Sequence, residues 1–159
     1  MKLTKGFWAV ACVALAVSVQ AKEAMVDTLK QKFPLAEVSE VSTTNFLVRL
    51  TADCGPVIFT GKIGGLTLDL NGHSIIGKNE ATNDVDGTAL WLKDVNVSLN
   101  IKGPGEIIGG DGAPQAVGGY GVYNAYYGNS SYRAIVTVGA GVLVRGGGGG
   151  DRRRDGGAF

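Results

Sequence analysis

The sequence predicts an all-β solenoid, in which short strands stack in successive layers. The main observation is a strand-turn-strand unit that occurs three times, at 66–77 (LTLDLNGHSIIG), 97–110 (VSLNIKGPGEIIGG) and 135–147 (IVTVGAGVLVRGG). Units that recur at intervals of about thirty residues are typical of repeat architectures, where each repeat packs on its neighbours. The second observation is that the glycine-rich connections between the units vary in length, as outer loops of such folds do.

Apolar and polar residues alternate within each unit. Leu66, Leu68 and Leu70 fall on one face of the first strand, and Thr67 and Asp69 fall on the other. The segments at 97–102 and 136–138 repeat this pattern. Each strand is therefore expected to have one dry face and one solvated face.

Other elements precede and separate the units. Residues 24–32 (AMVDTLKQK) have the spacing of a short amphipathic helix, which we expect to cap one end of the stack. Strands are expected at 37–41, 46–50 and 57–60, and a second type of strand at 89–92 and 121–124. The connections at 77–87 and 109–119 are expected to be polar, solvated turns.

Residues 1–21 have the pattern of a secretory signal peptide. Two lysines precede an apolar run from Trp8 to Val19, and cleavage is expected after Ala21. The run is shorter than the roughly twenty residues that span a bilayer, so we expect export without a membrane span once the signal is removed. The expected location is secreted, periplasmic or at the cell surface.

Charge and cysteine content exclude several classes of function. Of 15 basic residues, Lys2 and Lys5 lie in the signal, so the 14 acidic residues slightly outnumber the bases that remain. A nearly neutral chain has no field that would recruit nucleic acid. Cys54 has no cysteine partner after processing, and we expect it to be a small buried residue and not a reactive thiol.

The expected domain organisation has four parts. Residues 1–21 are the signal peptide, 22–56 hold the cap helix and entry strands, 57–146 hold the repeated units, and 147–159 form a disordered Gly/Arg-rich tail. The tail lacks both alternation and a capping helix, and three or four layers are near the minimum for a repeat array. We therefore expect the chain to be a truncated remnant of a longer protein.

The segment from Leu66 to Gly77 closely resembles the LDLNGHTI segment of exported proteins of the pectin-lyase-like superfamily. The resemblance covers about three units, from Val57 to Gly146. It implies a right-handed parallel β-helix of about three to four coils with a short N-terminal capping helix. It does not imply an activity, because polysaccharide lyases, hydrolases and adhesins share that fold.

No catalytic or metal site is predicted. Asp69 faces outward as the catalytic acids of β-helix hydrolases do, but the equivalent positions are expected to hold Asn100 and Thr137, so the second carboxylate is missing. His73 is interpreted as part of a structural corner motif with Asn71 and Gly72, whose residue types suit a tight turn. The segment 79–87 (NEATNDVDG) fails the spacing of a calcium loop, so no metal or other cofactor is expected.

Five tyrosines gather in one segment, 120–132 (YGVYNAYYGNSSY): Tyr120, Tyr123, Tyr126, Tyr127 and Tyr132. Aromatic rings among Gly, Asn and Ser suit a surface that binds sugars, although such rings also stiffen a loop.

The leading prediction is an exported structural or adhesin-like segment without an active site. The alternatives are a fragment of a polysaccharide lyase or hydrolase, and a glycan-binding module; expected partners are a polysaccharide, a cell-surface glycan, or a second copy pairing edge to edge.

Overall fold

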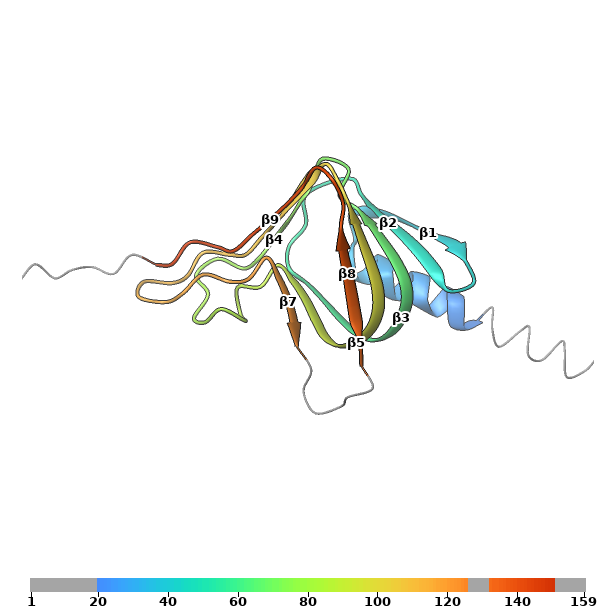
Figure 1. The fold of residues 1–159 in the computed structure, drawn as a ribbon, viewed down its shortest axis with the longest axis horizontal. Helices are drawn as coiled ribbons and strands as arrows, with labels where there is room; N and C mark the ends of the chain where they lie inside the picture. Colours follow the sequence, from blue (N-terminus) through green and yellow to red (C-terminus); the bar gives the residue numbers. More distant parts are fainter. Residues whose placement is uncertain (1–19, 126–131, 151–159) are drawn as a thin grey trace, which may run out of the picture.

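The computed structural model describes residues 20–125 and 132–150. Within these ranges, a helix over residues 20–32 is followed by strands in two sheets (Figure 1). The strands are β1 (Ala36–Ser42), β2 (Asn45–Leu50), β3 (Val57–Asp69), β4 (Ser74–Ile76), β5 (Leu90–Lys102), β6 (Gly105–Ile108), β7 (Val122–Ala125), β8 (Ala134–Val138) and β9 (Val142–Arg145). The predicted signal peptide lies almost entirely outside the described residues, as does the tail from residue 151 onward.

The two sheets run side by side along the molecule. The six-stranded sheet has the order β1-β2-β3-β5-β7, and β8 also pairs with β5, beyond the end of β7. The three-stranded sheet has the order β4-β6-β9. All these pairs are parallel except β1 with β2.

The predicted fold class, an all-β right-handed parallel β-helix, is wrong. The large sheet is mixed, a second sheet lies beside it, and a helix is part of the domain, which makes this a small α/β-like fold. The physical reason lies at β1 and β2, which are separated only by Thr43 and Thr44. A two-residue connection reverses the chain, so the two strands pair antiparallel, whereas a parallel pair needs a much longer crossover.

Strand β3 is longer than predicted. The sequence suggests separate strands at 57–60 and 66–70, but β3 runs through both as one 13-residue strand. It bends between Phe59 and Gly64, where the register against β5 shifts twice and Gly61 and Gly64 have φ of 79° and 84°. Glycine accepts this conformation without a steric penalty, so the strand turns without ending.

The predicted alternation of dry and wet faces is confirmed in β3 and β5. Leu66, Leu68 and Leu70 are buried, and the same face of β5 buries Val97, Leu99 and Ile101. These residues align across the sheet, Leu66 with Leu99 and Leu68 with Ile101. The core is therefore a set of apolar rows that run from strand to strand.

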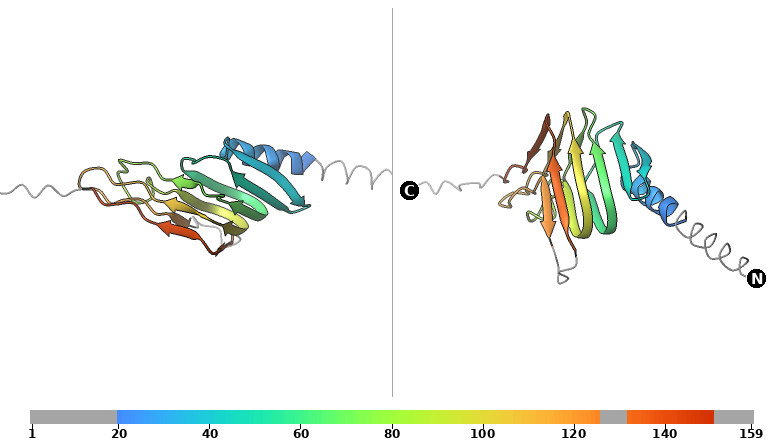
Figure 2. Two further views of the ribbon diagram at one scale, coloured as in Figure 1. Left: turned by 90° about the horizontal axis from the view of Figure 1, so that it is seen from above. Right: turned by 45° about the vertical axis from the view of Figure 1, so that its right-hand side comes forward.

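The helix predicted at 24–32 is present and runs over residues 20–32. It buries Leu29 against the core, and Phe33, directly after it, packs its ring 5.9 Å from that of Phe59. An ion pair of 2.9 Å from Lys22 to Glu40 joins the helix to β1. Figure 2 shows the helix and β1 at one end of the row of strands and β8 and β9 at the other.

The glycine-rich connections pack on one another. Segments 77–88, 109–121 and 146–150 extend together from the sheets (Figure 1), and a chain of backbone hydrogen bonds links Gly87, Gly110, Gly119 and Gly147 at 2.8–2.9 Å. Gly87, Gly110 and Gly119 are buried. The expectation of solvated turns is therefore wrong for these glycines. We call this part the glycine lobe.

Candidate functional site

Three aromatic rings gather where the glycine lobe meets β7. Tyr120 and Tyr123 stack with ring centroids 5.0 Å apart and planes 9° from parallel. Tyr123 also contacts Trp91 of β5, at 6.1 Å and 47°. Tyr120 is 40% exposed, and the two rings behind it are half-buried. We call Trp91, Tyr120 and Tyr123 the aromatic cluster.

Asp84 fixes the outermost ring of the cluster. The Tyr120 hydroxyl donates a hydrogen bond of 2.5 Å to Asp84 Oδ2, and the Tyr120 N–H donates one of 3.3 Å to the Asp84 carbonyl. The hydrogen bond to this carboxylate, with its negative charge, raises the pKa of Tyr120. The phenol therefore stays protonated and remains a donor.

Sequence reasoning missed Trp91. It joins the cluster because β5 and β7 pair in a register that sets Trp91 opposite Tyr123. Lys93 Nζ lies 5.0 Å from the centre of the indole ring, a cation–π distance. The one signal in the sequence is the position of Trp91 between the buried Leu90 and Leu92, because alternation places it on the outer face.

The other tyrosines of the predicted glycan site are not in this cluster. Tyr126 and Tyr127 lie outside the described residues. Tyr132 is described and half-buried, and no ring contact joins it to the aromatic cluster among the described residues. Of the five tyrosines predicted to bind a glycan, the structure places Tyr120 and Tyr123 in the aromatic cluster.

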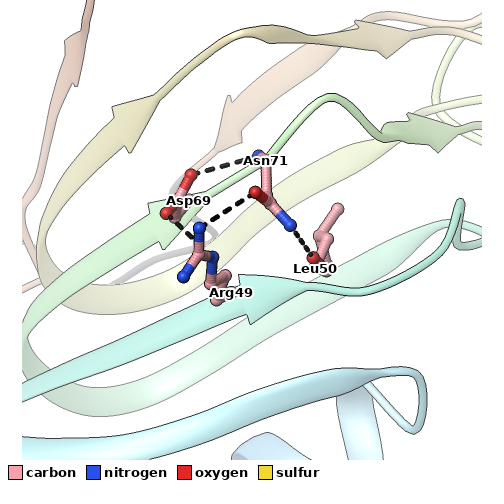
Figure 3. Close-up of polar contacts among 4 residues, drawn as sticks. All are labelled: Arg49, Leu50, Asp69 and Asn71. Carbon is pink, nitrogen blue, oxygen red and sulfur yellow. Dashed lines mark hydrogen bonds and ion pairs between the residues drawn. The ribbon is translucent and has the colours of Figure 1, made fainter.

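Asp69 is bound into a polar network with β2 and the following turn (Figure 3). Arg49 Nε lies 3.6 Å from Asp69 Oδ2, and Arg49 Nη2 donates a hydrogen bond of 3.1 Å to Asn71 Oδ1. Asn71 in turn donates its N–H to Asp69 Oδ1 at 3.1 Å and its Nδ2 to the Leu50 carbonyl at 3.0 Å. Asn71 and Gly72 have φ of 51° and 87° in this turn.

The neighbours of Asp69 differ from those the sequence suggested. Asn100 and Thr137 align with Thr67, and the residue that aligns with Asp69 in β5 is Lys102. The expected alignment was wrong by two residues because turn lengths alone do not set the register. Asp69 therefore has a cation on each neighbouring strand, Arg49 on one side and Lys102 on the other.

His73, the last residue of the corner motif, lies beside the loop that holds Cys54. Its Nδ1 is 3.7 Å from Asp53 Oδ1, and the Ser74 N–H donates a hydrogen bond of 2.8 Å to the same oxygen. Burial, with the nearby Asp53 carboxylate, raises the pKa of the Cys54 thiol from 9.0 to about 11. A thiol so far from ionisation is a poor nucleophile at neutral pH.

Residues that could hold a metal ion do not cluster in the described part of the chain: no group of three or more His, Cys, Asp or Glu side chains is close enough. Within residues 20–125 and 132–150, no helix is both long and apolar enough to cross a lipid bilayer.

Comparison with family models, curated proteins and solved structures finds no match. The resemblance of 66–77 to the pectin-lyase-like superfamily accordingly has no support from these comparisons.

Proposed function

We propose that this chain is an exported, non-catalytic structural segment of the adhesin-like kind, located in the periplasm, at the cell surface or outside the cell. The observation that carries the proposal is the environment of Asp69, the one carboxylate that sequence reasoning considered for catalysis. Arg49 and Asn71 occupy both of its oxygens, and the aligned residue of β5 is Lys102. Glycosidic cleavage needs a second carboxyl group across the scissile bond, and this arrangement supplies cations instead.

Two further observations support the proposal. The raised pKa of Cys54 keeps its thiol protonated, which makes nucleophilic catalysis by this residue unfavourable. The first 21 residues have the charge and length of an export signal.

Export is tested by expressing the full chain and determining the N-terminus of the product by mass spectrometry. We expect cleavage after Ala21 and recovery outside the cytoplasm. Retention of residues 1–21 in a cytoplasmic product would contradict this part of the proposal.

The absence of catalysis is tested by incubating the purified chain with a panel of neutral and acidic polysaccharides and measuring new reducing ends and unsaturated products. We expect the wild type and Asp69→Asn to give the same background. Turnover that disappears in Asp69→Asn would instead identify the fragment of a polysaccharide lyase or hydrolase.

A further inference from the structure

The aromatic cluster has the composition of a sugar-binding site. We propose that the exposed face of Tyr120, supported by Tyr123 and Trp91 and flanked by Asp84, binds a neutral hexopyranose unit of a polysaccharide. This goes beyond the structural role argued above, and neither proposal depends on the other.

The ring that would contact the sugar is held in place before binding. Tyr123 stacks on one face of Tyr120 at 5.0 Å, and Tyr120 as a whole is 40% exposed, so a sugar would bind against the other face. The hydrogen bond from the phenol to Asp84 holds the hydroxyl end of the side chain and so restrains the first torsion, and the stack on Tyr123 restrains rotation of the ring about its own axis. Binding therefore costs little side-chain entropy, which is the advantage of a rigid aromatic anchor.

Tyr120 lies between two glycines. Its neighbours in sequence are Gly119 and Gly121, which carry no side chain that could shade the ring. These glycines are fixed by packing, since a Cβ on Gly121 would lie 2.6 Å from the Arg145 carbonyl oxygen. The two residues that flank Tyr120 in the glycine lobe therefore add no side chain beside the ring.

Asp84 supplies the polar half of the site and selects the ligand. Its Oδ2 accepts the Tyr120 hydroxyl, and its Oδ1 accepts no hydrogen bond from the described residues. A carboxylate oxygen beside an aromatic face suits the hydroxyls of a sugar whose C–H face lies on the ring. The negative charge of Asp84 opposes a uronate, so the favoured ligand is an uncharged hexose polymer.

The test is affinity electrophoresis of the full chain in native gels that contain hydroxyethylcellulose, with polygalacturonate gels for comparison. We expect the wild type to be retarded by the neutral polymer only. Tyr120→Ala should weaken this binding about tenfold or more, and Tyr120→Phe, which keeps the ring, should weaken it less. Tyr132→Ala is the matched control, because this tyrosine of the same segment makes no ring contact with the cluster, and it should bind as the wild type does.

Circular dichroism melts show whether each variant is folded, and Asp84→Asn provides a second variant that keeps the ring and the shape of the site. Loss of retardation in Asp84→Asn supports the proposal. Retardation of Tyr120→Ala equal to that of the wild type, absence of any retardation of the wild type, or preference for polygalacturonate would overturn it. None of these outcomes bears on export or turnover, which are measured separately.

Discussion

Asn71 illustrates how one side chain can hold a turn and two strands together. It adopts φ of 51°, a conformation that costs an ordinary L-residue about 1 kcal/mol or more. Its side chain also bonds to Arg49 of β2 and to the Leu50 carbonyl, so the turn after β3 is tied to the neighbouring strand. An asparagine serves both requirements, because it tolerates this backbone and carries both a donor and an acceptor.

Two substitutions of Asn71 separate the contribution of its side-chain hydrogen bonds from that of its backbone conformation. Asn71→Ala loses both hydrogen bonds and keeps the backbone penalty, so we expect it to lower the free energy of unfolding by about 2 kcal/mol or more. Asn71→Gly loses the same bonds but relieves the backbone, and should cost about 1 kcal/mol. Urea unfolding measures both variants. Equal losses would mean that the backbone conformation is not a source of strain.

Cys54 should make the stability depend on pH in the alkaline range. Its thiol pKa is 9.0 in the reference state and about 11 in the folded chain, because burial and Asp53 disfavour the thiolate. Below pH 9 the thiol is protonated in both states and its contribution to stability is fully present. As the pH rises from 9 to 11 the unfolded chain ionises first, so this contribution is lost.

Two measurements check the behaviour of Cys54. The urea midpoint of the wild type should fall more steeply between pH 8.5 and 10.5, a range set by these pKa values, than that of Cys54→Ala. Iodoacetamide should alkylate the native chain at pH 8 more slowly than the chain unfolded in urea. Equal alkylation rates would contradict the raised pKa.

The limits of prediction at this scale are seen in Trp91 and Asp69. Alternation places each on the outer face, and the structure agrees. Their partners, Tyr123 and Lys102, depend on strand register, which is set by bends and connections elsewhere in the chain. The nearest sequence neighbours therefore say little about which side chains meet in a candidate site.

At the level of elements, the glycine lobe replaces side-chain packing with backbone packing. A Cβ on Gly119 would overlap the backbone of Gly87, and one on Gly109 would overlap the carbonyl of Gly119. Such close approach lets the backbones of three loops form hydrogen bonds directly to one another. The lobe also supports Tyr120, so its packing is connected to the candidate sugar site.

Gly119→Ala tests this packing. The added methyl meets rigid backbone and not a flexible side chain, so we expect a loss of about 1–3 kcal/mol in the free energy of unfolding, or failure to fold. Gly55→Ala is the matched control, because a Cβ there meets nothing within 4 Å, and its stability should stay near that of the wild type. If urea unfolding gives the two variants equal stability, the loops do not pack as described.

Helices and strands could be predicted from the sequence where the local pattern of apolar and polar residues alone determines them. The apolar spacing of the helix and the alternation in β3 and β5 are local properties, and both predictions hold. The antiparallel pairing of β1 and β2 and the continuity of β3 through its bend were missed. The antiparallel pairing follows from the short Thr43–Thr44 connection, which is a local signal. The continuity of β3 follows from its glycines, which can bend a strand as well as end one.

At the scale of the whole molecule, the two ends of the sheets differ. The helix and β1 cover one end, where Leu29 and Phe33 are buried. At the other end, Val138 aligns with the buried Ile101 and Val144 with the buried Ile107, yet Val138 is 49% and Val144 38% exposed. Residues on the core-facing side of β8 and β9 therefore contact solvent, beside backbone edges that pair with no further strand among the described residues.

This exposed end predicts self-association through β8 and β9. A second copy would cover the valines and pair the free strand edges. Because the helix covers the apolar core at the opposite end, where Leu29 and Phe33 are buried, we expect contact between two like ends, which closes into a dimer. Sedimentation velocity over a range of concentrations should therefore show a monomer–dimer equilibrium, and Val138→Lys with Val144→Lys should shift it to monomer. Val41→Lys is the control, since Val41 is 66% exposed on β1 at the capped end and its replacement should leave the equilibrium unchanged. A wild type that stays monomeric at every concentration, or a double variant that dimerises equally well, would contradict this prediction.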